Sequence, residues 1–228
     1  MAYNKARDLS YYEYQRYPIA SRIIEIILDF CVGEDFAVKL RIMKRDAKGE
    51  TKDTERNDAQ LVWDDFCEDP VNEFYEQLSG YVLDALVNGE LSIPAFVNPA
   101  NGSVRLGYFD PGNIKEVYLD PNNVKEVQRV EFSKPNSTDV ESFTVIRPDT
   151  DFESKNYGKL GGQMFYFRLN RVRGAKRGYP ELLNVVDWID QLEQFIFDAV
   201  QGFAMRNAFA WDVEVTGATE EKLKTMEF

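Results

Sequence analysis

The sequence predicts an α+β fold in which helices and an antiparallel β region precede one long helix near the C-terminus. Apolar residues repeat at helical spacing in several stretches, and short alternating stretches separated by turn residues occupy 88–169. A last helical pattern runs from Pro180 to Ala210. The 228 residues are 44% hydrophobic and 14% aromatic, which is enough to fill one large domain or two small ones.

The N-terminal part predicts mainly helices. Residues 1–17 are rich in tyrosine and favour a short helix or an arm on a neighbouring subunit. Pro18 begins a pattern of isoleucines that ends at Gly33, and this pattern favours a helix. A strand remains an alternative because the segment is rich in β-branched residues. Residues 36–43 alternate as in a half-buried strand, and the polar residues 44–57 predict an exposed loop. Helical patterns follow over 58–68 and 71–87.

The β region is expected to contain several short strands. They are predicted over 91–97 and 104–109, joined by a hairpin with an Asn-Gly turn, and over 128–132, 143–147 and 163–169. The segment 110–117 recurs as 120–127, and each copy predicts an Asp-Pro turn that begins a strand. The repeat lacks the carboxylate pattern of an EF-hand, so no Ca²⁺ site is predicted.

The long helical pattern carries two stripes. An apolar stripe repeats at alternating steps of three and four, as in a heptad seam, and the span would be about 45 Å long. The stretch between Arg177 and Arg206 contains five acidic residues and no lysine or arginine. Two interpretations stay open: a helix crossing a two-layer domain, or a helix that packs against copies of itself and faces a water-filled space. The residues expected to face that space are Asp187, Gln191, Gln194, Asp198 and Gln201.

Charge argues against a protein that grips nucleic acid over its whole surface. The net charge is −12, whereas tight binding to phosphates needs clustered lysine and arginine. One basic cluster precedes the long helix. It predicts a contact with DNA phosphates or with a neighbour's acidic helix, or else solvated loop charges. Its members are Arg168, Arg171, Arg173, Lys176 and Arg177.

No catalytic, cofactor or metal site is predicted. The chain has no histidine and none of the common nucleotide, hydrolase or zinc motifs. Acid pairs such as Asp64/Asp65, Asp187/Asp190 and Glu220/Glu221 are expected by chance among 39 acidic residues, although a Mg²⁺-dependent enzyme stays open. Cys31 and Cys67 are expected to be buried free thiols, with a disulfide between them left open. Without a signal peptide or a membrane-length apolar run, a soluble protein is expected.

Two stretches resemble the portal proteins of tailed double-stranded DNA bacteriophages. One stretch, residues 88–114, contains the Asp-Pro-x-x-Ile turn of that family's wing domain. The other, residues 170–215, contains the Arg-Gly-x-x-x-Leu motif that precedes a long stem helix. Here Tyr179 follows the Arg-Gly pair in place of the usual small residue. The residues that match the two motifs are Asp110, Pro111 and Ile114, and Arg177, Gly178 and Leu182.

The resemblance implies a portal-like wing domain over 1–170 and a basic loop with a long stem helix over 171–210. Residues 211–228 would begin the clip or form a truncated C-terminal element. Family portals continue with a second stem helix and often a crown, so a fragment or a truncated portal is expected. The implied protein is not an enzyme.

The implied function is a homo-oligomeric ring, usually of twelve subunits, at the unique capsid vertex. Double-stranded DNA passes through it during packaging and genome ejection, and the tail attaches to it. Expected partners are other copies, DNA, the terminase, the major capsid protein and head-tail adaptor proteins, with no membrane. The expected location is the virion, after assembly in the host cytoplasm. Another ring-forming head-tail protein and a monomeric binding module remain alternatives.

Overall fold

The computed structural model describes residues 3–33, 36–40, 43–45, 51–53, 58–134, 139–149, 155 and 160–208. The chain divides into two compact units, Met1–Val186 and Asp187–Phe228. The boundary after residue 170 that the portal resemblance implies stays a prediction. The loop that follows belongs to the first unit because the Tyr179 N–H donates to the Leu169 carbonyl at 3.0 Å and because Leu182 is fully buried.

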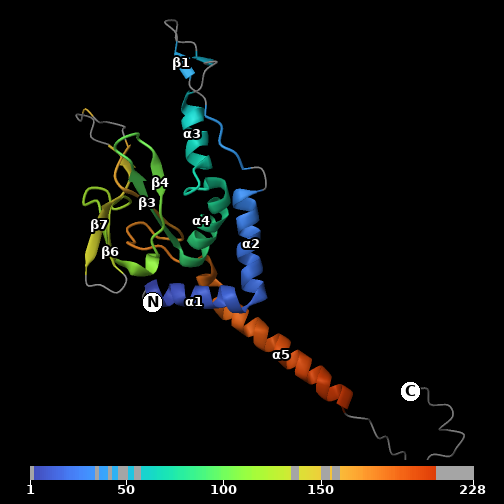
Figure 1. Ribbon diagram of the computed structural model, residues 1–228. Helices are drawn as coiled ribbons and strands as arrows, with labels where there is room; N and C mark the ends of the chain where they lie inside the picture. Colours follow the sequence, from blue (N-terminus) through green and yellow to red (C-terminus); the bar gives the residue numbers. More distant parts are fainter. Residues whose placement is uncertain are drawn as a thin grey trace, which may run out of the picture. The chain divides into compact units, whose positions relative to one another are not determined.

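Four helices form one side of the first unit: α1 (Tyr3–Arg16), α2 (Pro18–Val32), α3 (Asp58–Glu68) and α4 (Phe74–Asn88). In Figure 1, α2 and α4 lie side by side and α1 crosses their lower ends. The tyrosine-rich segment is therefore a helix. The isoleucine segment is also a helix, as favoured, and the Gly33 N–H closes it by donating to the Asp29 carbonyl at 3.1 Å.

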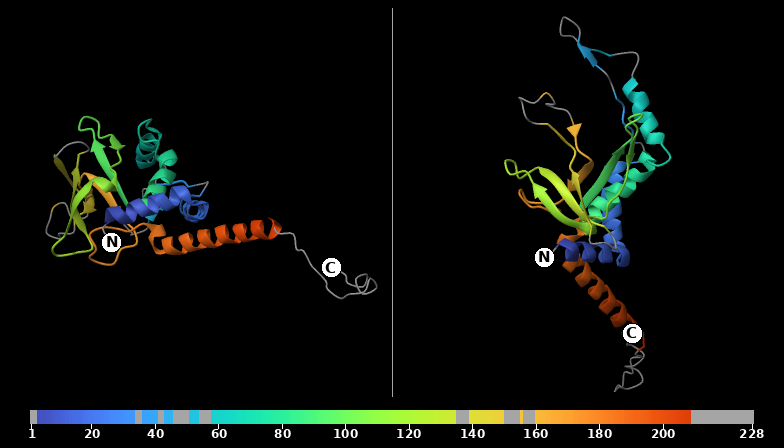
Figure 2. Two further views of the ribbon diagram at one scale, coloured as in Figure 1. Left: turned by 90° about the horizontal axis from the view of Figure 1, so that it is seen from below. Right: turned by 60° about the vertical axis from the view of Figure 1, so that its left-hand side comes forward.

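Antiparallel strands form the other side. The order β10 (Met164–Arg168), β3 (Glu90–Val97), β4 (Val104–Leu106) makes one sheet, and β5 (Ile114–Leu119), β6 (Val127–Ser133), β7 (Val140–Thr144) makes a second. Figures 1 and 2 place the helices on one side of β3 and the second sheet on the other. This mixture of helices and antiparallel sheets confirms the α+β class.

The apolar core has two parts. A small cluster between α4 and β3 contains Ala85, Leu91 and Ile93. A larger cluster joins the two sheets, where an isolated bridge pairs Val145 with Met164. Its buried members are Ile114, Val117, Val127, Val130, Phe132, Val145, Met164 and Tyr166.

Several predicted elements are wrong in position. Residues 36–40 are not a strand, and residues 41–42 lie outside the described part of the chain. The strand pairing falls instead on polar residues, where β1 (Met43–Arg45) pairs with β2 (Thr51–Asp53) in a segment expected to be a loop. Alternation alone does not make a strand, because a strand also needs a partner. α4 begins at Phe74 because a turn centred on Asp69 and Asn72 occupies the preceding residues.

The Asp-Pro repeat forms the same turn twice. The Asp110 and Asp120 carboxylates accept from the backbone N–H two residues later, at 2.7 and 2.9 Å. The first copy continues through η1 (Pro111–Asn113) directly into β5. The second copy is followed by a longer turn, and its strand begins only at Val127. A further short pair joins β8 (Arg147–Pro148) to β9 (Leu160–Gly161).

Apart from its first residue, α5 (Val186–Ala208) belongs to the second unit. It is 23 residues long and thus about 35 Å. The predicted helix started at Pro180. Residues 181–184 form the 3₁₀ turn η2 (Glu181–Asn184), closed by bonds from Leu183 to Pro180 and from Val185 to Leu182. The predicted strand 211–215 and the whole of 211–228 lie outside the described residues. In the part of the chain that is described, no helix is long and apolar enough to cross a bilayer.

Candidate functional site

The two motifs that carry the portal resemblance meet in the first unit. Arg177 donates from Nη2 to the Pro111 carbonyl at 2.8 Å, across 66 residues of sequence. Pro111 and Ile114 are buried at the start of β5, and Leu182 is buried in η2. The Asp110 carboxylate caps its own turn and accepts from Arg7 at 3.0 Å. The motifs therefore form a single packed junction.

A buried ion pair lies at the centre of this junction. Arg177 Nε is 2.9 Å from both carboxylate oxygens of Glu90, whose side chain is fully buried at the start of β3. The Gly178 N–H donates to the same carboxylate at 2.6 Å. Burial raises the pKa of Glu90, and the hydrogen bonds from Arg177 and Gly178 oppose that rise. The pair fixes the loop after β10 against β3.

Tyr3 covers the other face of the arginine. The guanidinium carbon of Arg177 lies 3.7 Å from the centre of the Tyr3 ring, which is cation–π geometry. The Tyr3 hydroxyl donates to the Asn88 carbonyl at 2.9 Å. Burial raises the pKa of Tyr3, so the hydroxyl stays neutral at physiological pH. The Nε and Nη2 groups and the planar face of the Arg177 guanidinium thus all contact groups of its own chain.

The glycine of the Arg-Gly motif is required by close backbone packing. A Cβ at Gly178 would lie 2.2 Å from the Gly89 carbonyl oxygen and 2.9 Å from the Leu169 nitrogen. Gly89 also has a positive φ of 76° and ends α4. Three backbone segments therefore approach one another here too closely for any side chain.

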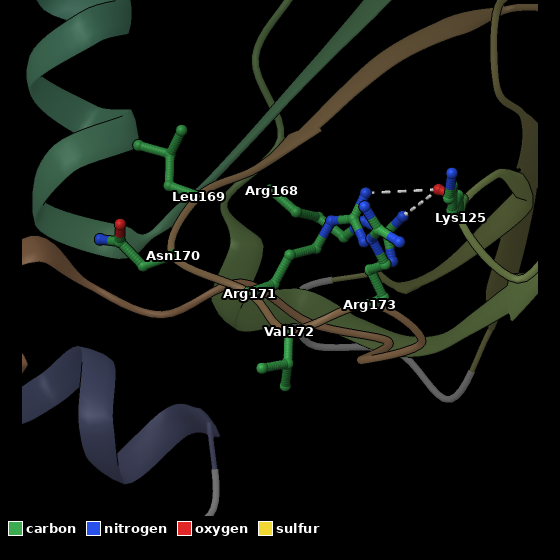
Figure 3. Close-up of a pocket in the computed structure, with 7 residues that line it drawn as sticks. All are labelled: Lys125, Arg168, Leu169, Asn170, Arg171, Val172 and Arg173. Atoms are coloured by element: carbon green, nitrogen blue, oxygen red, sulfur yellow. Dashed lines mark hydrogen bonds between the residues drawn. The ribbon is translucent and has the colours of Figure 1, made fainter.

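Three of the remaining basic residues line a pocket at the end of β10. It has a volume of about 660 Å³ and contains Arg168, Arg171 and Arg173 beside Lys125. Figure 3 shows the three guanidinium groups gathered on the Lys125 side of the loop, while Val172 points away from them. Arg168 and Arg171 both donate to the Lys125 carbonyl, at 3.0 and 3.4 Å. Loop carbonyls thus hold at least two of the cations in place.

These pocket arginines differ from six other arginines in the described part of the chain. Six arginines form ion pairs with a carboxylate of the same chain: Arg7, Arg22, Arg105, Arg129, Arg147 and Arg177. Among the described residues, no carboxylate lies within ion-pair distance of Arg168, Arg171 or Arg173. Burial, followed by the charge of Arg171, lowers the pKa of Arg168. Lys176, the fifth member of the predicted cluster, binds Glu116 and lies outside this pocket.

The five residues predicted to face a water-filled space lie on one side of α5. Successive helical residues are rotated by about 100°, so Asp187, Gln191, Gln194, Asp198 and Gln201 share a polar face. All five are exposed, and Gln194 donates to Asp198 at 2.9 Å. On the opposite side, large apolar residues are exposed as well: Trp188, Leu192, Phe195, Ile196, Val200 and Phe203.

The acid pairs and the cysteines add no further site. Among the described residues, no three histidine, cysteine, aspartate or glutamate side chains converge as a metal site would need. Glu220 and Glu221 lie outside the described part. Both cysteines are free, but only Cys67 is buried, so the expectation of a buried Cys31 is wrong.

Sequence reasoning missed Glu90, Tyr3 and Lys125. Glu90 stands at the beginning of an apolar strand, and its burial depends on an arginine 87 residues away. A charged residue beside Gly89 in a strand that is otherwise buried is the only local signal. Lys125 contributes through its backbone carbonyl, for which the sequence carries no signal. Comparison with protein-family models and with curated proteins finds no match to the chain.

Proposed function

We propose that the chain is a ring-forming portal subunit that contributes a wing domain and a first stem helix. The observation that carries this proposal is the exposed apolar face of α5. Phe195 and Phe203 are 70% and 64% exposed, and four more large apolar residues share their side of the helix. Patches of this kind mark interaction surfaces. A helix with a heptad-like apolar seam can bury such a patch by packing against copies of itself.

The junction of the two motifs supports the same proposal. In the family that the sequence resembles, the Asp-Pro turn belongs to the wing and the Arg-Gly motif precedes the stem helix. In this chain Arg177 links the two motifs directly through its hydrogen bond to the Pro111 carbonyl. Only glycine fits at position 178, because the neighbouring backbone leaves no room for a Cβ. A rigid connection of this kind suits a subunit whose loop must hold its position within a ring.

The polar face of α5 suits a channel for DNA. Acidic and amide side chains do not neutralise phosphates, so they release no counterions and form no tight contact with a duplex. Double-stranded DNA can then slide past Asp187, Gln191, Gln194, Asp198 and Gln201. In this proposal the ring, usually of twelve subunits, occupies the capsid vertex of a virion. The terminase, capsid protein and head-tail adaptors bind its outer surfaces, and the chain itself catalyses no reaction.

Light scattering and negative-stain electron microscopy on the same sample test this proposal. The expected result is a particle of uniform mass with rotational symmetry and a central hole. Leu192→Lys combined with Ile196→Lys should abolish the particle, and Gln191→Lys on the polar face is the matched control that should keep it. A strictly monomeric wild-type chain at every concentration would contradict the proposal.

A further inference from the structure

We propose that the pocket formed by Arg168, Arg171 and Arg173 binds the acidic edge of α5 from a second copy of this chain, through the carboxylates of Asp190 and Glu193. The inference rests on the proposed function, which supplies the second copy. It adds to that proposal which surface of the second copy binds the pocket, and that the contact between subunits is head-to-tail.

The pocket is arranged as an anion-binding site, and no carboxylate among the described residues pairs with its three arginines. Arg168 donates to the carbonyls of Ala175 and Lys125, at 2.7 and 3.0 Å, so its guanidinium is oriented before any ligand arrives. Arg171 shares the Lys125 carbonyl. Placing like charges together without a carboxylate is unfavourable. Six arginines elsewhere in the described residues pair with carboxylates of the same chain, whereas these three adjacent cations do not. An incoming oxyanion group would relieve the repulsion and could accept bidentate bonds from the planar guanidiniums.

The acidic edge of α5 has the complementary property. Among the described residues, Asp190 and Glu193 form no ion pair, and the nearest cation along the helix is Arg206. At about 100° per residue the two acids lie between the apolar and the polar face. Acids that flank an apolar seam are placed to pair across a helical interface. Residues three apart have Cβ atoms about 5–6 Å apart, which suits two neighbouring arginines.

Head-to-tail assembly explains why one chain carries both surfaces. A ring closed by rotation uses two different patches on each subunit, and these patches must be complementary. The unpaired cations of the pocket and the unpaired acids of α5 are such a pair. Duplex DNA is a weaker candidate for the pocket, because the net charge of −12 repels it and the acids of α5 would stay unpaired.

Charge exchange tests the contact. Arg171→Glu with Arg173→Glu should weaken self-association more than about tenfold, since close charge pairs at interfaces are strongly coupled. Asp190→Arg with Glu193→Arg should weaken it similarly, and combining all four substitutions should restore most of the loss. Arg105→Glu, at an exposed arginine outside the pocket, is the matched control and should leave assembly unchanged. The measurement is sedimentation velocity over a range of concentrations at low and high salt.

Cross-linking decides the question if a charge-reversed chain fails to fold. In a Cys31→Ser background, one chain carries Arg173→Cys and a second carries Asp190→Cys. A short bismaleimide can span the gap that an arginine–carboxylate pair leaves between the two Cβ atoms, which is too wide for a disulfide. Treating the mixture with this reagent should produce a cross-linked heterodimer, with little linked product from either chain alone. Absence of the heterodimer in an assembled sample would overturn the inference.

The remaining outcomes separate this inference from the proposed function. If the Arg171→Glu/Arg173→Glu variant assembles as well as wild type, the inference is overturned and the proposed ring still stands. A wild-type chain that never self-associates would overturn both. If wild type binds a labelled DNA duplex and the Arg171→Glu/Arg173→Glu variant does not, the pocket binds phosphates and the inference is overturned.

Discussion

Arg177 donates from Nε to both carboxylate oxygens of Glu90, at 2.9 Å each, and the carboxylate is fully buried. The pair links the start of β3 to the loop that follows β10. Arg177 also reaches the Pro111 carbonyl, so the turn before β5 joins the same junction. Three segments distant in sequence thus depend on one ion pair.

Replacing Glu90 should destabilise the first unit strongly. Glu90→Gln removes the charge but keeps the shape, which leaves Arg177 buried without its anion, and such a change costs about 3–5 kcal/mol. Urea unfolding at neutral pH measures the difference. The matched control is Glu141→Gln, which breaks an exposed pair with Lys134 and should cost less than about 1 kcal/mol. Equal losses in the two variants would contradict the central role of the pair.

Two glycine substitutions should have opposite effects. Gly178→Ala places a Cβ 2.2 Å from the Gly89 carbonyl oxygen, so the backbone must shift and the free energy of unfolding should fall by more than about 2 kcal/mol. Gly80→Ala, in the interior of α4, meets nothing within 4 Å and should raise stability by about 0.5–1 kcal/mol. Thermal unfolding of both variants provides the comparison. A neutral Gly178→Ala would show that the close approach is not needed.

The two contacts of Tyr3 can be separated. Tyr3→Phe keeps the ring over Arg177 and loses the hydrogen bond to the Asn88 carbonyl, which should cost about 1 kcal/mol. Tyr3→Leu also removes the cation–π contact and should cost about 1–2 kcal/mol more. Chemical unfolding of the two variants and wild type at the same pH measures both losses of unfolding free energy. If Phe and Leu are equally destabilising, the ring contributes nothing through the arginine.

Asp120 should contribute to acid sensitivity. The Asn122 N–H, followed by Arg147, lowers the pKa of Asp120 below its ordinary value of 3.8. The folded state therefore binds this proton less readily than the unfolded chain. Its stabilising effect is present above the ordinary pKa and is lost as the pH falls through the lowered value. Asp120→Asn should show a shallower loss of stability below about pH 4 than wild type.

The measurement for Asp120 is the urea midpoint at a series of acidic pH values. Arg147→Gln should reproduce part of the effect, because Arg147 is the second contributor to the lowered pKa. Curves for Asp120→Asn and wild type that stay parallel from neutral to acidic pH would contradict the assignment.

Reversing two charges on the polar face of α5 should create affinity for DNA. In the proposed ring, Asp187→Lys with Asp198→Lys brings cations to the channel wall, where they release counterions from phosphates. Fluorescence anisotropy with a labelled duplex should detect binding that weakens steeply with salt. Glu68→Lys with Glu76→Lys, at exposed positions on α3 and α4, is the control with the same change in net charge. Equal binding by both variants would contradict a channel position for the polar face.

The sequence by itself determined the class of the fold and most of its regular elements. Helical periodicity identified α3 with its observed bounds, and Gly33 marked the end of α2. The Asn-Gly hairpin between β3 and β4 is also as predicted, because the Asn98 and Ser103 backbones close it locally. These features depend on interactions between residues that are close in sequence, so the spacing of residue types is enough to predict them.

Only the tertiary structure decided the junction and the start of α5. Arg177 looked like one cation in a basic cluster, and its burial against Glu90 depends on the packing of three segments. Helical spacing extended α5 back to Pro180, but Leu182 is buried in the first unit and the chain there forms a 3₁₀ turn. The pocket likewise depends on Lys125, more than 40 residues before Arg168. Long-range contacts set burial and charge pairing, and local periodicity carries no information about them.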